Sequence, residues 1–420
     1  MPSDAAGRGA DEAGPAAASD RLLGTVVREE AGRIVAALTR SIGSLDIAEE
    51  AVADAIEEAL REWRTRGIPP RPGAWLTQAA RHNALDRLRR EKRYRDKLAL
   101  LAEPERVDAV TGAADPDERL PLLFGCCHPA LSPDAQLALT LRAVCGLTTR
   151  QIARATLSSE QAASQRIVRA KRKIGLAGIP IRVPEGAERR DRLDIVLTVV
   201  SVMYSEAHLA AGADAAADRD VADDALWLAR VIAAALPGEP EAHGLVALLG
   251  FHRAREDARA VDGDLVLLAD QDRSRWNAAL VADARRALAR AAALRRPGRW
   301  QLHAAIAACH ADARTAADTD WGQVRVLYDM LLAYDGSPIV RLNRAVAVLQ
   351  ADGAGQALAE LDSLAQTLDG YHLWHAVRAE ALRALGRDDL ALAADLRALE
   401  LTANEAERRL LERRLRLPPG

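Results

Sequence analysis

Apolar side chains recur every three or four residues along most of this chain, which is the spacing of helices that bury one face. The first predicted helix covers about residues 21–40, the second residues 46–60 and the third residues 75–93. In the second helix the predicted core face consists of Ile47, Val52, Ile56 and Leu60. In the third helix the predicted buried stripe consists of Leu76, Ala80, Ala84, Leu85 and Leu88. These helices predict a small bundle at the start of the chain.

A loop and a reversal of charge separate the second and third predicted helices. The loop covers residues 64–73, because three prolines there cannot lie inside a helix: Pro69, Pro70 and Pro72. The polar face of residues 46–60 is acidic, whereas residues 75–93 carry a dense basic face. A solvated surface explains many such runs, but an acidic face also suits a basic protein and a basic face suits a polyanion. The order therefore suggests two different partners on two faces.

A second helical domain is predicted over residues 119–176. Its first helix ends near Cys126, and Ser132 followed by Pro133 has the chemistry of a new helix start. The helix that follows, over residues 135–145, carries apolar positions that can pack behind later helices: Leu137, Leu141 and Val144.

Residues 148–173 have the pattern of a helix-turn-helix. Two capping boxes, Thr148 with Gln151 and Ser158 with Gln161, predict two helix starts ten residues apart. The second helix has one apolar face, consisting of Ala163, Ile167, Ala170 and Ile174. Its other faces carry amide and basic groups, which can read base edges and hold phosphates. An ordinary solvated hairpin fits the same pattern, so this stretch alone does not decide between the two interpretations.

Composition agrees with an all-α fold. The 420 residues suffice for two or three domains, with 49% hydrophobic but only 3% aromatic residues, and strand-like runs are nearly absent. A net charge of −3 argues weakly against a general polyanion binder, so a DNA-binding surface would have to be local. No apolar run approaches the length of a membrane span, and residues 1–20 lack the apolar core of a signal peptide. We expect a soluble, cytoplasmic protein with no membrane partner.

No catalytic or metal-binding pattern stands out. No CxxC pair occurs, so buried free thiols are expected at Cys126, Cys127, Cys145 and Cys309. Two aspartate pairs, Asp270 with Asp272 and Asp318 with Asp320, have no nucleophile or base beside them and fit helix caps better. Histidines are scattered singly and no glycine-rich phosphate loop occurs. We expect no enzyme activity, no cofactor and no metal.

Two motifs in a fixed order carry a family resemblance. The first combines Asp46-x-Ala48-Glu49-Glu50-x-Val52-x-Asp54 with Trp75-Leu76 and the run from Ala80 to Arg90. It resembles region 2 of bacterial sigma-70-family factors of the extracytoplasmic-function (ECF) type. The second runs from Leu131-Ser132-Pro133 through Ile152-Ala153 to the segment between Arg166 and Lys173, and it resembles region 4 of the same family. The resemblance implies a disordered tail (1–20), region 2 (21–97), a linker (98–118) and region 4 (119–176).

The resemblance also implies a function and its residues. A sigma factor binds core RNA polymerase and directs it to promoter DNA by recognising the −10 and −35 elements. The loop at residues 64–73 would hold an extruded base. The implied polymerase-binding residues are Asp46, Glu49, Glu50 and Asp54. The implied DNA-binding residues are Arg81, Asn83, Arg87, Arg89 and Arg90 for the −10 element, and Gln161, Ser164, Gln165, Arg166, Arg169, Lys171, Arg172 and Lys173 for the −35 element.

Residues 181–420 exceed a minimal factor and contain an internal repeat at offset 34. The repeated pairs are Ala345 with Ala379, Val348 with Leu382, Ala357 with Ala391 and Leu358 with Leu392. That period is the tetratricopeptide (TPR) one, and the segment resembles an ECF subgroup with a TPR-like C-terminal extension. The resemblance implies a fused regulatory domain with a possible unknown regulator.

Two alternatives remain. A one-component helix-turn-helix regulator with a TPR sensor would need neither the acidic helix nor the proline loop. A purely structural scaffold dominated by the C-terminal repeats would require that residues 1–180 bind neither DNA nor polymerase.

Overall fold

The computed structural model describes residues 15–98, 119–156, 158–209, 215–261, 264–402 and 404–416. Most of the predicted tail (1–20) and linker (98–118) lie outside these residues. The chain divides into two compact units, Met1–Val199 and Val200–Gly420. The described residues are almost entirely helical, which confirms the predicted all-α fold. Among them, no helix combines the length and the apolar character needed to cross a membrane.

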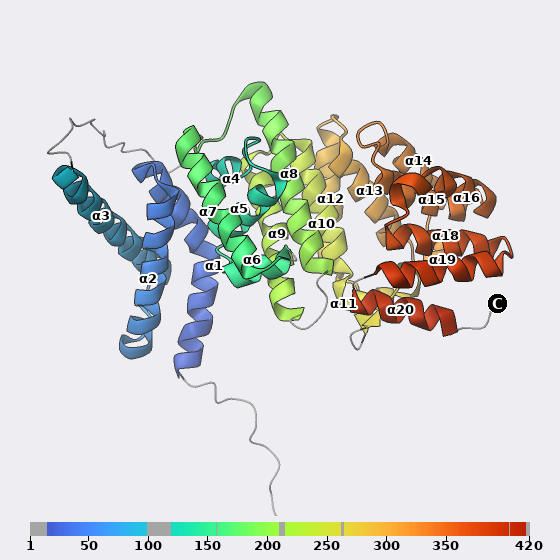
Figure 1. Ribbon diagram of the computed structural model, residues 1–420, viewed down its shortest axis with the longest axis horizontal. Coiled ribbons are helices and arrows are strands. Elements are labelled where there is room, and N and C mark those ends of the chain that lie inside the picture. The colour runs from blue at the N-terminus through green and yellow to red at the C-terminus, as the bar shows by residue number, and fades with distance from the viewer. Residues whose placement is uncertain are drawn as a thin grey trace, which may run out of the picture. The chain divides into compact units, whose positions relative to one another are not determined.

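Three long helices begin the first unit and pack on one another: α1 (Pro15–Ile42), α2 (Leu45–Arg66) and α3 (Pro72–Leu98) (Figure 1). The first helix begins before residue 21, where the prediction began it. The connection between α2 and α3 is also shorter than predicted, because residues 64–66 remain in α2 and Pro72 opens α3. Proline is accepted at the first position of a helix, where its missing N–H has no partner to lose. The predicted loop of residues 64–73 is thus reduced to residues 67–71.

Alanines line the core face of α2, in place of some of the predicted larger residues. Ile47 and Val52 are buried as predicted, whereas Ile56 and Leu60 are half-buried. The fully buried positions are Ala48, Ala51, Ala55 and Ala59, and small side chains there let neighbouring helices approach closely.

The buried stripe of α3 is narrower than predicted. Leu76, Ala80 and Ala84 are buried, Leu88 is half-buried, and Leu85 is 44% exposed. Leu85 directly follows buried Ala84, and consecutive helical positions do not share a face. Its prediction as a core residue was wrong.

Four further helices form the second part of this unit: α4 (Arg119–Cys126), α5 (Pro133–Ala143), α6 (Thr149–Ala155) and α7 (Glu160–Ala177). Phe124, Leu139 and Ile152 are fully buried among them. Helix α7 ends at Gly178, whose φ of 58° is the left-handed conformation that glycine adopts readily. Residues 179–185 are non-helical, and α8 (Gly186–Leu209) follows.

The start of α8 is attached to the α4–α7 group. The Arg192 guanidinium is buried, donates a hydrogen bond to the carbonyl oxygen of Phe124, and lies 5.8 Å from the centroid of the Phe124 ring. It also donates to Glu188 at 3.1 Å. The first unit therefore extends to Val199, beyond residue 176, where the second helical domain was predicted to end.

The second unit consists mainly of paired helices. The helices of its first half are α9 (Ala215–Ala235), α10 (Pro240–Ala254), α11 (Glu256–Arg259), α12 (Ala278–Ala293), α13 (Arg299–Asp312) and α14 (Trp321–Leu331). Between α11 and α12 lie the strands β1 (Ala260–Val261) and β2 (Asp264–Leu265), which pair antiparallel with Ala260 opposite Leu265. Short 3₁₀ turns are η2 (Leu268–Asp270), η3 (Arg273–Arg275) and η4 (Ala316–Asp318).

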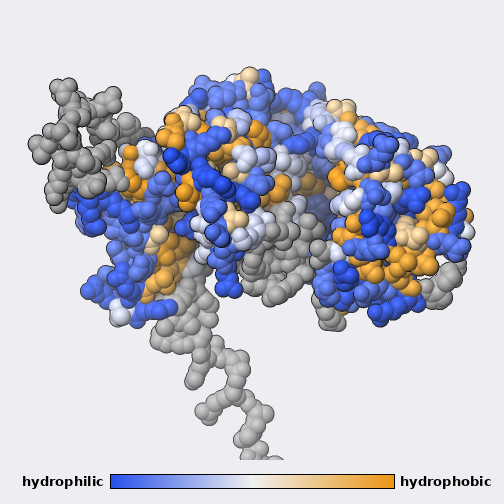
Figure 2. All heavy atoms as spheres, viewed as in Figure 1, coloured by the Kyte–Doolittle hydropathy of each residue, from blue (hydrophilic) through white to orange (hydrophobic). Residues whose placement is uncertain are grey.

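The helices of the second half follow the predicted 34-residue repeat. They are α15 (Pro338–Ala351), α16 (Ala354–Ser363), α17 (Ala365–Leu368), α18 (His372–Ala384), α19 (Asp388–Leu401) and α20 (Glu405–Arg416). The α15–α16 and α18–α19 pairs begin 34 residues apart. Three predicted repeat pairs are buried in both copies, but Leu392 is exposed whereas Leu358 is buried. Figure 2 shows hydrophobic surface over this part of the chain, and the exposed leucines of α18 and α19 include Leu373 and Leu390.

Candidate nucleic-acid interface

The two helices α6 and α7 begin at different kinds of cap. The first predicted capping box is confirmed, since the Thr148 N–H donates to Gln151 Oε1 at 2.9 Å and the Gln151 N–H to Thr148 Oγ1 at 3.3 Å. The second is wrong by one residue. Ser159 caps α7 by accepting a hydrogen bond from the Ala162 N–H at 3.1 Å, while the Ser158 hydroxyl bonds to that of Thr156 at 2.9 Å. Because the Ser158 hydroxyl is bonded to Thr156, Ser159 caps the helix instead.

The predicted base-reading side chains of α7 share one exposed face. The apolar face is buried as predicted, at Ala163, Ile167, Ala170 and Ile174. On the opposite side the structure places the exposed residues Gln161, Ser164, Gln165, Arg169, Arg172 and Lys173. Spacings of three and four residues put the first four on neighbouring turns. We call Gln161, Ser164, Gln165, Val168 and Arg169 the reader stripe.

Val168 was not predicted as a functional residue. It is 61% exposed and lies three residues after Gln165, within the reader stripe. An apolar side chain in such a place can contact the methyl group of thymine. The signal was present in the sequence, because Val168 directly follows the buried Ile167 and cannot share its face.

Two other basic residues of α7 are held by carboxylates within this unit. Arg166 is half-buried and pairs with Asp134 of α5 at 3.4 Å. Lys171 is only 16% exposed, and its Nζ lies 3.3 Å from Asp46 Oδ1 and also pairs with Glu49, both of α2. In this arrangement both side chains are less exposed than those of the reader stripe.

The Lys171 contact joins the two predicted binding surfaces. Glu49 belongs to the predicted polymerase-binding set, yet its side chain is only 7% exposed. The pKa of the nearby Cys126 thiol is raised well above its ordinary value. Burial is the main cause, and the neighbouring Cys127 and the Glu49 carboxylate add to it. All four cysteines are buried free thiols, as predicted. A buried carboxylate needs a cationic partner, and Lys171 provides it.

The other two predicted polymerase-binding residues are paired in the same way. Arg87 of α3 donates to Asp54 at 2.7 Å and also pairs with Glu50. These contacts, chiefly the hydrogen bond with Asp54, raise the pKa of the Arg87 guanidinium above its ordinary value. Each predicted polymerase-binding carboxylate is thus paired with a side chain from the predicted DNA-binding set.

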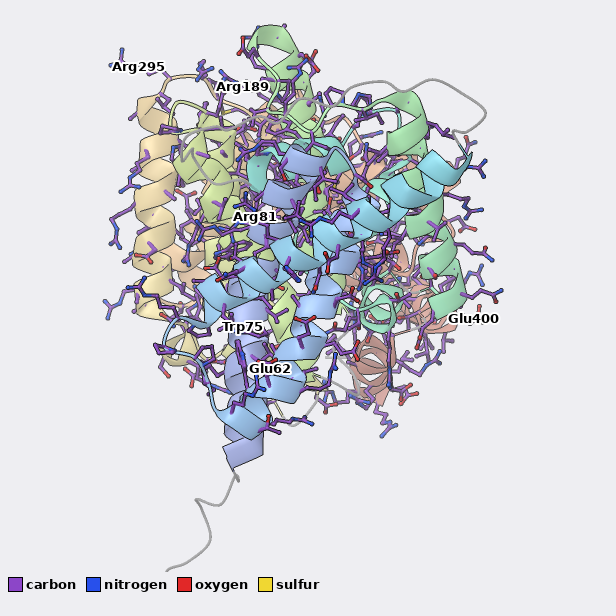
Figure 3. All side chains as sticks on the ribbon, turned by 90° about the vertical axis from the view of Figure 1, so that its left-hand side faces the viewer. Glu62, Trp75, Arg81, Arg189, Arg295 and Glu400 are labelled. Atoms are coloured by element: carbon purple, nitrogen blue, oxygen red, sulfur yellow. The ribbon has the colours of Figure 1, made fainter. Side chains whose placement is uncertain are left out.

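The remaining basic face of α3 is open. Arg81, Arg89 and Arg90 are exposed, with Arg89 also 3.2 Å from Asp86. Asn83 is half-buried, and its amide nitrogen is buried with no hydrogen-bond partner among the described residues. Figure 3 looks onto α3 and shows Arg81 and Trp75 along it.

Two tryptophans support the short loop before α3. Trp63 of α2 is buried, and its ring centroid lies 5.6 Å from that of Trp75 in an edge-to-face arrangement. The two rings stand on either side of residues 67–71 in the sequence. Their contact holds the end of α2 next to the start of α3 and so limits the conformations of the exposed loop.

Replacing Arg87 by alanine is expected to loosen the contact between α2 and α3. The pairs with Glu50 and Asp54 are partly exposed, so their loss is expected to cost about 1 kcal/mol of local stability. Amide hydrogen exchange measured by mass spectrometry should then speed up about fivefold in α2 and α3. The exposed Arg90→Ala variant is the matched control. Unchanged exchange together with weakened DNA binding would show that Arg87 acts on DNA and not on the fold.

Three sequence families match separate parts of the chain. Residues 26–94 match the family described as "Sigma-70 region 2", and residues 122–174 match "Sigma-70, region 4". Residues 192–292 match a family of unknown function (DUF6596). The first two matches lie within α1–α3 and α4–α7 respectively.

A curated relative is similar to nearly the full chain. "Uncharacterized protein R00370" of Rhizobium meliloti (strain 1021) is 41% identical over 379 residues, which is 88% of this chain and 90% of the relative. No solved structure matches the chain significantly.

Proposed function

Because the chain belongs to the sigma-70 family of transcription initiation factors, we propose that it is an ECF-type factor that reads the −10 and −35 promoter elements through α3 and α7. It also shares a family with the Rhizobium meliloti protein along most of its length. Catalysis in transcription belongs to the polymerase, and a factor of this kind contributes promoter choice and strand opening.

The reader stripe is the observation that carries the proposal. An α-helix fits the major groove, and glutamine and arginine can each form paired hydrogen bonds with a base edge. Gln165 and Arg169 are exposed one turn apart, with Gln161 and Ser164 on the preceding turn. Arg172 and Lys173 follow at the end of the same exposed side, where they suit phosphates.

For the −10 element, the proposal rests on the basic face of α3 and the loop before it. The exposed guanidinium groups of Arg81, Arg89 and Arg90 suit the backbone of a separated strand. Extruding a base costs a few kcal/mol, so a loop with few accessible conformations suits that task. The tryptophan pair at Trp63 and Trp75 supports such a loop.

Binding of polymerase would require the two groups of helices to separate. Asp46 and Glu49 are paired with Lys171, and α7 lies against the start of α2 at that point. Lys171 would be released to DNA in the same step that frees the two carboxylates for polymerase. We therefore propose that the described arrangement is a closed state of the factor.

The second unit is proposed to be a TPR-like regulatory domain. Support comes from the α15–α16 and α18–α19 pairs at the 34-residue offset and from the exposed leucines on α18 and α19. Its covalent attachment would allow it to act in place of a separate regulator.

Shortening the chain to residues 1–178 tests this regulatory role. Promoter activity of the shortened chain is expected to lose its dependence on growth conditions. If the shortened chain instead matches the full-length chain under every condition, the regulatory role is contradicted. The truncation also deletes Arg192 and with it the hydrogen bond to the Phe124 carbonyl oxygen. The full-length Arg192→Gln variant is therefore the control for loss of that attachment.

Run-off transcription with purified core polymerase tests the sigma-factor role. Core polymerase is expected to initiate at a cognate promoter only when the chain is added. Tight binding of the chain alone to duplex DNA, without any transcript from several candidate promoters, would favour a one-component regulator instead.

A further inference from the structure

A polar cavity in the second unit is not used by promoter recognition. It has a volume of about 260 Å³ and lies among α10, α13, α14, α15 and the segment that carries η2 and η3. This volume is slightly below the range of about 300–1,000 Å³ that is usual for small-molecule sites. The inference drawn from it goes beyond the proposed function and does not depend on it.

The cavity lining includes both apolar and polar side chains. Leu248, Phe251, Leu268 and Ile306 provide the apolar lining. The polar lining consists of His252, Arg255, Trp276, His303, His310, Tyr328 and Asn343. Apolar walls with a few convergent polar groups are the usual construction of a small-molecule site.

Arg255 supplies the positive charge of this lining. It is half-buried, its guanidinium lies 3.2 Å from His252 Nδ1, and among the described residues no ion pair with a carboxylate is found for it. The nearby Glu256 is paired with Arg253 at 2.5 Å. A guanidinium removed from water needs an anionic partner, and the residues that the structure describes provide none for Arg255.

Two of the three lining histidines, His303 and His310, do not add to this charge at neutral pH. Burial, followed by the charges of Arg255 and Arg273, lowers the pKa of His310 to about 4. Burial also lowers the pKa of His303. Both imidazoles are therefore neutral near pH 7 and can act only as hydrogen-bonding groups.

A second unused donor belongs to Trp276, whose side chain also lines this cavity. The indole nitrogen of Trp276 is buried with no hydrogen-bond partner among the described residues. The Trp276 ring is held in place by Arg273, whose guanidinium carbon lies 4.8 Å from its centroid. Arg273 is itself fixed by donating to the carbonyl oxygens of His310 and Ala313, the latter at 3.0 Å. The unused donor is thus on a supported side chain.

We propose that this cavity binds a small organic carboxylate. Its carboxylate group is held by Arg255 and the Trp276 indole N–H, and its apolar part lies against Phe251 and Ile306. A carboxylate fits better than a phosphate, because Arg255 is the one guanidinium among the lining residues and balances a single negative charge, while His303 and His310 are neutral. The volume limits the ligand to a molecule the size of a small aromatic or short aliphatic acid.

Calorimetric titration of the full-length chain tests the proposal. The probes are benzoate, phenylacetate and butyrate, with phenylacetamide as the neutral counterpart of phenylacetate and inorganic phosphate as the alternative anion. At least one carboxylate is expected to bind saturably, and phenylacetamide at least about tenfold more weakly than phenylacetate if that acid binds. No saturable binding by any carboxylate, or binding of phosphate alone, would overturn the proposal.

Three variants complete the test. Arg255→Gln is expected to weaken carboxylate binding at least tenfold, while Arg286→Gln, on the exposed side of α12, leaves it unchanged. Ala311→Phe fills the cavity without changing its charge and is expected to abolish binding. Thermal melts establish that each variant is folded. Carboxylate binding that survives both Arg255→Gln and Ala311→Phe places the ligand elsewhere and contradicts the assignment.

Discussion

Replacing both Gln165 and Arg169 by alanine is expected to reduce transcription from a cognate promoter at least about thirtyfold. A well-placed paired hydrogen bond to a base contributes about 1–3 kcal/mol of discrimination, and each 1.4 kcal/mol is a factor of ten. Both side chains are exposed in the reader stripe and lie on the side of α7 away from its buried face, so their loss leaves the core intact. Quantitative run-off transcription on wild-type and −35-mutated promoters measures the effect.

The single variant Lys173→Gln provides the contrast. A phosphate contact carries no sequence information, so this change is expected to weaken binding equally on all promoters and to lower the salt dependence by about one unit of slope. The double alanine variant should instead lose its preference for the native −35 sequence. If both variants weaken all promoters equally, the reader stripe does not read bases.

Replacing Gly32 by alanine is expected to open the closed state and to strengthen binding of core polymerase about tenfold or more. A Cβ at this position of α1 would overlap the backbone carbonyl oxygen of Val144 at the end of α5. Backbone cannot move aside as a flexible side chain can, so α1 and α5 must separate. In the unsubstituted chain, core polymerase binds only the minor population of open molecules. In the variant this population is larger, so the apparent affinity rises. Equilibrium titration with labelled core polymerase measures the change.

Two further variants separate opening from damage to the helix. Gly24→Ala changes the same helix at a position where a Cβ meets nothing within 4 Å, and is expected to have no effect on polymerase binding. Lys171→Met removes the cation that compensates buried Glu49, and should open the molecule as Gly32→Ala does. Opening by either variant without stronger polymerase binding would contradict the closed-state proposal.

The helices and the faces they bury were largely predictable from the sequence, whereas their exact ends and some core positions were not. The burial of Ala163, Ile167, Ala170 and Ile174 follows from spacing alone. The cap at Ser159 does not, because Ser158 has the same capping chemistry and only its bond with Thr156 decides between them. In α2, close helix packing favoured alanines over the larger Ile56 and Leu60.

The pairing of the candidate site residues could not be predicted. Arg87 lies 33 residues from Asp54 in sequence, and Lys171 lies more than a hundred residues from Glu49. Such contacts depend on how separate helices meet, which local periodicity does not encode. The same holds for the second unit's cavity, since Arg255, Trp276 and His310 come from three separate elements.

The central claim is that α3 and α7 are two parts of one promoter reader. Start-site mapping on promoters of altered spacing tests it most directly. Purified core polymerase and the full-length chain are given a cognate promoter and a version with about half a helical turn of DNA, roughly 5 base pairs, inserted between the two elements. The account predicts that the insertion nearly abolishes specific initiation, and that inserting a whole turn restores little because polymerase fixes the distance. Specific initiation that is indifferent to the insertion would contradict it.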